Sequence, residues 1–216
     1  MTVSTSADGS EWRRHGSLVL AAAVGFSFMS FMTAAAGVFM GPLTDAFGWS
    51  KTELTAGMAL SAVFGIFFSP VVGICIDKWG TRRIAIPGVL VTACLIASFA
   101  FLNGSFAQWM ILWALWGLGS LLIQSTVWAA AVASVFKSAK GLALGVTMSG
   151  TAVAQIIAPP LANWLIAQFG WQSAYAALGL GWGGIALALT ILFLYDAHDI
   201  RRGKAQRLME GERSLL

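Results

Sequence analysis

The chain is poor in charged residues. Only 10% of its 216 residues are charged, while 58% are hydrophobic. A soluble fold of this size needs far more charge, about 25%, to cover its water-facing surface. The lack of charge therefore excludes an ordinary soluble domain and predicts a protein whose solvent is lipid. For the same reason, the formal net charge of +4 is interpreted as a topology signal and not as a site for nucleic acid.

Residues that bind metals or catalyse reactions are also scarce. The chain has two cysteines, Cys75 and Cys94, and two histidines, His15 and His198, and their spacing fits neither a metal site nor a disulfide framework. The interiors of the long apolar stretches hold no Asp, Glu, Lys, Arg or His. Acid–base and nucleophilic catalysis in the membrane then lack their ionisable groups, so we expect no enzyme, no metal and no cofactor.

Six apolar stretches are long enough to cross a membrane, because a helix rising about 1.5 Å per residue needs about 20 residues to span a hydrocarbon core of about 30 Å. Lipid offers no partner for backbone N–H and C=O groups, so each stretch is expected to be helical. The predicted fold class is an all-α membrane protein with six transmembrane helices. They are predicted at Ser17–Met40, Glu53–Ile76, Ile84–Leu102, Phe106–Phe136, Leu142–Phe169 and Trp171–Tyr195.

The basic residues predict the orientation of these helices. With six crossings and a cytoplasmic N-terminus, every Lys and Arg except Lys51 lies in a cytoplasmic segment, which is the asymmetry that orients membrane proteins. We therefore predict a cytoplasmic tail at residues 1–16, a six-helix transmembrane domain at 17–195, and a cytoplasmic tail or interdomain linker at 196–216. The expected location is the lipid bilayer of a bacterial inner (plasma) membrane, with both termini cytoplasmic.

Local signals mark the helix boundaries. Ser50 with Glu53, and Ser105 with Gln108, have the spacing of capping boxes that open the second and fourth predicted helices. Phe-Gly-Trp sequences at Gly48 and again at residues 169–171 place a chain-turning glycine beside an interfacial tryptophan. The sequence therefore predicts sharp turns at both glycines.

Uncharged polar side chains recur at i, i+4 and i+8 in the fourth and fifth predicted helices, and the first carries a looser stripe. Polar faces must point to protein or water instead of lipid, so the stripes are predicted to converge on one cavity. Alternatively, Ser and Thr bond their own backbone and the two Gln bond across helices. Both interpretations stand for Gln124 and Gln155, and the structural one is favoured for Ser27, Ser30 and Thr33. The candidate cavity residues are Ser30, Thr33, Gln124, Trp128, Thr147, Thr151 and Gln155.

A second face of the fifth predicted helix carries only small residues. Gly141, Gly145 and Ser149 recur every four residues, about 160° from the polar face. Small residues let helix backbones approach closely, so this face predicts a close helix contact.

The most specific motif occupies residues 73–83, between the second and third predicted helices, and reads Gly-Ile-Cys-Ile-Asp-Lys-Trp-Gly-Thr-Arg-Arg. It resembles the signature loop of the major facilitator superfamily, G-x-x-x-D-[RK]-x-G-x-[RK]-[RK]. The alternative is a positive-inside loop with a capping Asp. The resemblance implies that Gly73 lets a neighbouring helix approach, that Gly80 makes the turn, and that charge contacts latch an outward-open state. The matching residues are Gly73, Asp77, Lys78, Gly80, Arg82 and Arg83, of which Asp77, Arg82 and Arg83 would form the latch.

Residues 38–50, the glycine-rich start of the fifth predicted helix and residues 169–175 look like the oxalate/formate and monocarboxylate porter branch of that superfamily. Two positions differ from its motifs. Trp113 stands where many proton-coupled members have an Arg, and Gly150 with Pro159-Pro160 only loosely matches an antiporter motif. The sequence therefore supports no prediction of proton coupling or antiport.

The resemblance implies the N-terminal six-helix half of the superfamily fold, built as a 3+3 inverted repeat, in which alternating access arises as one half rocks against the other. It implies a secondary transporter of a small organic solute such as a monocarboxylate, present as a half-length form. Its implied partners are the solute and a second six-helix half or a homodimer, because no cation in this half neutralises a carboxylate. The alternative is a truncated, non-transporting membrane component or regulatory half.

Overall fold

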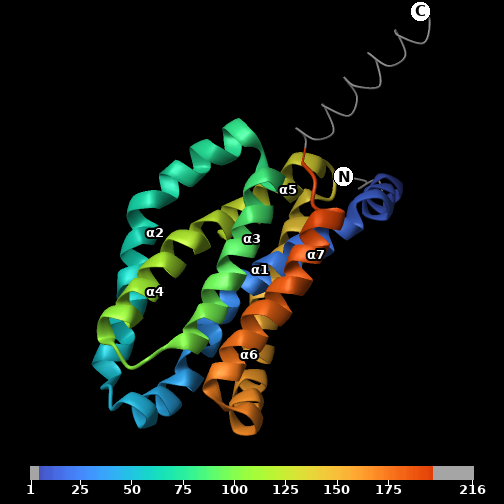
Figure 1. The fold of residues 1–216 in the computed structure, drawn as a ribbon. Helices are drawn as coiled ribbons and strands as arrows, with labels where there is room; N and C mark the ends of the chain where they lie inside the picture. The colour runs from blue at the N-terminus through green and yellow to red at the C-terminus, as the bar shows by residue number, and fades with distance from the viewer. Residues whose placement is uncertain (1–4, 197–216) are drawn as a thin grey trace, which may run out of the picture.

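The computed structural model describes residues 5–196, with side-chain surroundings from residue 9 onward. All regular elements in this range are helical, and they pack side by side as an elongated bundle (Figure 1). Two short elements are 3-10 turns (η1 and η2) and one is a π turn (η3). The elements are α1 (Thr5–Phe47), α2 (Lys51–Trp79), α3 (Thr81–Ser98), η1 (Phe99–Phe101), α4 (Phe106–Ser120), η2 (Leu121–Ile123), α5 (Ser125–Val135), α6 (Lys140–Ala177), η3 (Leu178–Trp182) and α7 (Gly183–Phe193).

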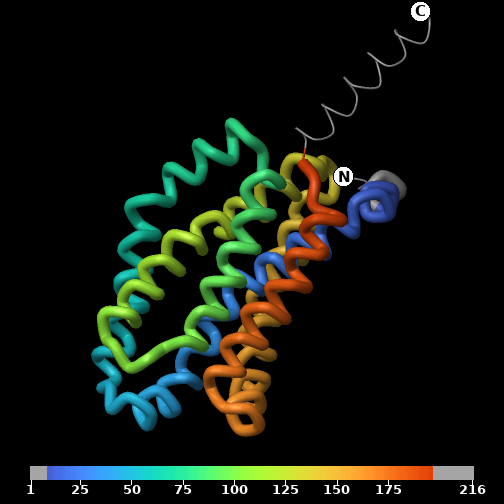
Figure 2. Tube along the Cα trace, in the orientation of Figure 1, coloured from blue at the N-terminus to red at the C-terminus, as the bar shows by residue number. Residues whose placement is uncertain are grey.

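Five helical segments of the described chain are long and apolar enough to cross a membrane. The sequence predicts six, because it ends one helix before Gly170 and starts another after it. The structure is helical over residues 140–193 except at Gly170, whose φ of 79° and ψ of 163° are not helical. The predicted turn at Gly170 is confirmed, as is the one at Gly48 with φ 71°. Figure 2 shows the chain reversing direction within its orange segment. The number of crossings stays a prediction.

The fourth predicted helix is broken at Gln124, which has φ −58° and ψ 159°. The break separates α4 and η2 from α5. The side chain of Trp128 explains it locally: its indole Nε1 donates to the carbonyl oxygen of Ile123 at 2.8 Å, while the amide of Val127 donates to Gln124 instead. The carbonyl of Ile123 thus has a side-chain partner where a continuous helix would supply a backbone amide.

One of the two predicted capping boxes is confirmed. The Ser50 hydroxyl accepts from the amide of Glu53 at 3.3 Å, and the Glu53 carboxylate accepts from the amide of Ser50 at 2.8 Å. The second prediction is wrong, because Ser105 makes no side-chain cap. Gln108 reaches further back and accepts from the amide of Asn103 at 2.9 Å, so it stabilises the preceding turn instead.

Helix α1 begins at Thr5, within the segment predicted as a tail. The Glu11 carboxylate accepts hydrogen bonds from the amides of Lys137, Ser138 and Ala139, just before α6 begins. These hydrogen bonds lower the pKa of Glu11, and the bond from the Ala139 amide has the largest effect. The predicted boundary at residue 16 is therefore no boundary of secondary structure. The predicted tail or linker at 196–216 lies outside the described residues apart from Asp196.

An aromatic cluster holds the bundle together. Tyr175 of α6 stacks on Phe39 of α1 with ring centroids 3.8 Å apart, and on Phe99 at 5.3 Å. Phe99 in turn meets the edge of Trp113, which lies against Gly57 of α2. Trp113 is 1% exposed, so the position at which the resembled motif has an Arg belongs to the apolar core in this chain.

Candidate functional site

The signature loop lies at the end of the bundle that also holds the start of α1 and the end of α7 (Figure 1). Asp77, Lys78 and Arg83 are exposed. Gly80 has φ 85°, which favours glycine, so it makes the turn between α2 and α3 as the resemblance implies. No other atom within 4 Å would meet a side chain at Gly73, so the neighbouring helix implied there is not among the described residues.

The charge contacts of the implied latch stay a prediction, because the described residues show only one hydrogen bond from its two arginines. Arg82 turns to α7, where its Nη2 donates to the carbonyl oxygen of Ile191 at 2.9 Å. Asp77 and Arg83 remain exposed, and neither forms an ion pair within residues 9–196. In this structure Arg82 therefore contacts α7, while Asp77 and Arg83 are available to something outside the described chain.

One residue that the sequence analysis missed contacts this loop. Asp196 follows α7, is 3% exposed, and accepts hydrogen bonds from Thr81 through one carboxylate oxygen. The bond to the Thr81 amide measures 2.6 Å and the bond to its hydroxyl 3.0 Å. The two partners are 115 positions apart in the sequence, so no local pattern would have revealed the contact.

The candidate cavity residues differ in their exposure. Trp128 and Thr147 are both 0% exposed and are packed within the described helices, so their place in a cavity stays a prediction. Trp128 bonds Ile123, and the Thr147 hydroxyl donates to the carbonyl of Ala143 in its own helix. Gln155 of α6 is exposed.

Several of the remaining polar residues join helices to one another. Ser30 of α1 donates to Thr151 of α6 at 3.3 Å, and Gln124 accepts from Ser69 of α2 at 2.9 Å. Thr33 is exposed and donates to the carbonyl of Ser30 in its own helix. These bonds fit the structural interpretation of the stripes, and they include a hydrogen bond between two candidates, Ser30 and Thr151.

The small-residue face of α6 also differs from expectation. A side chain placed at Gly141 or Gly145 would meet nothing within 4 Å among the described residues. The close contact with α1 occurs instead at Gly150, where an added Cβ would meet the carbonyl oxygen of Ala23 and lie 2.9 Å from its carbonyl carbon.

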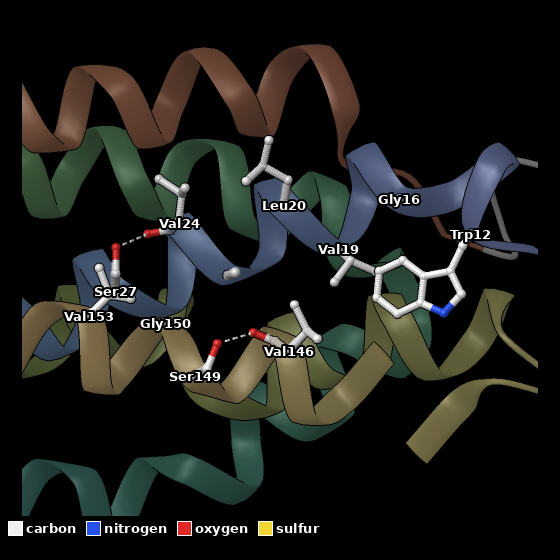
Figure 3. Close-up of a pocket in the computed structure, with 11 residues that line it drawn as sticks. Trp12, Gly16, Val19, Leu20, Val24, Ser27, Val146, Ser149, Gly150 and Val153 are labelled. Carbon is white, nitrogen blue, oxygen red and sulfur yellow. Dashed lines mark hydrogen bonds between the residues drawn. The ribbon is translucent and has the colours of Figure 1, made fainter. Parts of the chain in front are cut away.

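A groove of about 430 Å³ runs between α1 and α6 (Figure 3). Its walls are mostly apolar, and its two hydroxyls each donate to their own helix: Ser27 to Val24 and Ser149 to Val146. No charged side chain lines the groove, so it can hold an apolar surface and offers nothing to neutralise an anion. It is lined by Trp12, Gly16, Val19, Leu20, Ala23, Val24, Ser27, Val146, Ser149, Gly150 and Val153.

Comparison with known proteins gives relatives of one kind. The chain is 31% identical over 160 residues to monocarboxylate transporter 9 of Gallus gallus, covering 73% of this chain and 30% of that protein. It is 34% identical over 120 residues to the cis,cis-muconate transport protein of Acinetobacter baylyi, covering 54% of this chain and 26% of that protein. It is 39% identical over 90 residues to monocarboxylate transporter 12 of Mus musculus, covering 39% of this chain and 18% of that protein. The matches thus span about a third or less of these relatives.

The family model described as the Major Facilitator Superfamily matches residues 20–214. That match includes the signature loop and all helices after the first turns of α1. Together with the long apolar helices, it identifies an integral, multi-pass membrane protein. The chain belongs to the Major Facilitator Superfamily.

Proposed function

We propose that this chain forms one half of a secondary transporter that moves a small organic solute, of the carboxylate class, by alternating access. The observation that carries the proposal is the family match over residues 20–214. The names of the relatives, which are transporters of monocarboxylates and of cis,cis-muconate, support the substrate class. The exposed Asp77 and Arg83 of the signature loop would contact a second half during the transport cycle.

The proposal includes six membrane crossings. The segment 140–193 has 54 residues, and a continuous helix of that length would be about 80 Å long, far more than a hydrocarbon core of about 30 Å. The non-helical Gly170 divides it into two parts that are each long enough to cross once. Six crossings place nearly all basic residues on one side, which supports cytoplasmic termini in a bacterial inner membrane.

A second half is supported by the surfaces that this chain leaves open. Helix α2 buries only 17% of its most apolar window, compared with 67% for α1. The α1–α6 groove and the free space at Gly141 and Gly145 add apolar surface on α6. Such surfaces face lipid or another helix. We propose that a further six-helix unit, as a separate segment or a second copy, packs here and supplies the cation that an anionic solute requires.

Reconstitution tests this function. The chain is incorporated into proteoliposomes alone, and in parallel co-reconstituted with the C-terminal half of the Acinetobacter cis,cis-muconate transport protein, and uptake of labelled small carboxylates is measured. We expect uptake with a second half, and uptake by the chain alone only if crosslinking shows a homodimer. No uptake in either arm would favour the alternative, a non-transporting membrane component.

A matched pair of variants tests the signature loop. Asp77→Asn should slow uptake several-fold if its carboxylate takes part in conformational cycling. Asp45→Asn is the control, because Asp45 is also an exposed carboxylate and lies in the last turn of α1. Equal uptake by both variants and the unaltered protein would remove Asp77 from the mechanism.

A further inference from the structure

Two helix ends at the signature loop cap each other. The start of α3 receives the carboxylate of Asp196, whose oxygen accepts from the amide and the hydroxyl of Thr81. The end of α7 receives the guanidinium of Arg82, which donates to the carbonyl of Ile191. We name this pair of contacts, Asp196 with Thr81 and Arg82 with Ile191, the reciprocal cap.

Both contacts satisfy groups that a helix cannot satisfy itself. The first amides of α3 and the last carbonyls of α7 have no partners within their own helices. A carboxylate at a helix start and a cation at a helix end also oppose the partial charges of the helix dipole. The N-cap residue of α3 is Gly80, which has no side chain to donate or accept, so Asp196 performs this role from a distant part of the sequence.

The fit between Gly80 and Asp196 is close. A Cβ added at Gly80 would lie 2.7 Å from the carboxylate oxygen Oδ2 of Asp196, and the φ of 85° disfavours any other residue. Gly80 is therefore required twice, for the turn and for the space that the carboxylate occupies. Because Asp196 is 3% exposed, this contact is shielded from water and is stronger than a surface hydrogen bond.

We propose that Asp196 is a positioning residue for transport: it holds the α2–α3 loop in the conformation that presents Asp77 and Arg83, and it couples this loop to the end of α7. The role of Asp196 in transport rests on the proposed function. The proposal gives the two arginines of the motif different roles: Arg82 belongs to the reciprocal cap, and Arg83 belongs to the exposed surface.

Amide hydrogen exchange tests the anchoring, independently of transport. In the purified full chain in lipid nanodiscs, Asp196→Ala should speed exchange at residues 81–84 about five- to tenfold, as expected for loss of a helix cap. Asp196→Asn retains an oxygen acceptor and should restore most of the protection. Asp45→Ala, at an exposed carboxylate, should leave residues 81–84 unchanged. Unchanged exchange in Asp196→Ala would overturn the proposal.

If Asp196→Ala fails to fold, Arg82→Met tests the other contact of the reciprocal cap, with Arg83→Met as its control. Arg82→Met should speed exchange in the last turn of α7, and Arg83→Met should not. Equal exchange in these two variants would also overturn the proposal, because Arg83 is exposed and lies outside the reciprocal cap.

Transport kinetics separate positioning from simple stabilisation. The preparation is the chain co-reconstituted with a second half, as described above. There, Asp196→Ala should lower the maximal uptake rate several-fold and leave the half-saturating solute concentration unchanged. Asp196→Asn should restore the maximal uptake rate. Faster exchange with an unchanged maximal rate would overturn the role in transport. If the unaltered two-half protein transports nothing, the proposed function fails, and the exchange measurement still decides whether Asp196 holds the loop.

Discussion

Gly150 and Gly145 lie five residues apart on α6, yet the same substitution should affect them in opposite ways. A Cβ at Gly150 would meet the carbonyl oxygen of Ala23 and lie 2.9 Å from its carbonyl carbon and 3.2 Å from the amide nitrogen of Ser27. All three atoms belong to the backbone of α1, which cannot turn aside as a flexible side chain can. A Cβ at Gly145 would meet nothing within 4 Å.

The magnitudes follow from these two environments. Overpacking a close contact costs about 1–3 kcal/mol, and replacing Gly by Ala within a helix recovers up to about 1 kcal/mol. Gly150→Ala should therefore destabilise the chain by about 1–2 kcal/mol. Gly145→Ala has only the gain from replacing Gly by Ala within a helix, so it should stabilise the chain by about 0.5–1 kcal/mol. The two variants should differ by about 2 kcal/mol in their free energy of unfolding.

Thermal unfolding of the purified chain in one detergent, followed by far-ultraviolet circular dichroism, measures this difference. For a chain of this size, about 2 kcal/mol corresponds to a separation in Tm of about 4–8 °C, with Gly150→Ala the lower. Equal Tm values for the two variants would refute the assignment of Gly150 to the α1–α6 contact. A lower Tm for Gly145→Ala would show that this face is occupied within the chain itself.

Three further substitutions test contacts within the helices and at their ends. Ser50→Ala removes the confirmed capping box and should cost about 1 kcal/mol in thermal unfolding, whereas Ser105→Ala, which removes no side-chain cap, should cost little. Trp128→Phe leaves the buried carbonyl of Ile123 without its indole partner and should cost about 1–3 kcal/mol; a loss no larger than that of the exposed Trp164→Phe would contradict this. The pKa of Glu11 is lowered by backbone amides, so its carboxylate stabilises the folded chain above its ordinary pKa, and this contribution is lost as the pH falls through the lowered value. Glu11→Gln should therefore flatten the acid side of the stability profile measured by unfolding at each pH, and an unchanged profile would exclude the contact.

Patterns that depend on neighbouring residues predicted the structure well. The capping box at Ser50 depends on four consecutive residues, so it was predictable. The turns at Gly48 and Gly170 depend on a glycine within a three-residue Phe-Gly-Trp pattern, and both glycines have the expected positive φ. The apolar helices were predictable for the same reason, since hydropathy and length are local properties. The exact ends were not, because residues of the predicted N-terminal tail continue α1 as far back as Thr5.

One step of the spacing argument for the candidate cavity assumed an unbroken helix. Gln124 and Trp128 share a helix face only if the helix continues through Gln124, and it does not. The break directs the ring of Trp128 against Gly25 of α1, in the core. Similarly, the spacing of glycines on α6 identified small faces but not which face meets α1, because that depends on packing between helices.

Polar contacts between distant segments gather at one end of this bundle. Besides the reciprocal cap, the Glu11 carboxylate accepts from the amides before α6, and Nδ1 of His15 lies 2.6 Å from the Tyr195 hydroxyl beyond α7. These contacts tie α1, α3, α6 and α7 together near the signature loop (Figure 1). Rocking of one half against another requires each half to move as a unit. Hydrogen bonds between helices within lipid contribute only about 0.6–2 kcal/mol each. Several contacts at the helix ends add to them, and in the proposed two-half transporter they would let these four helices move together as one unit.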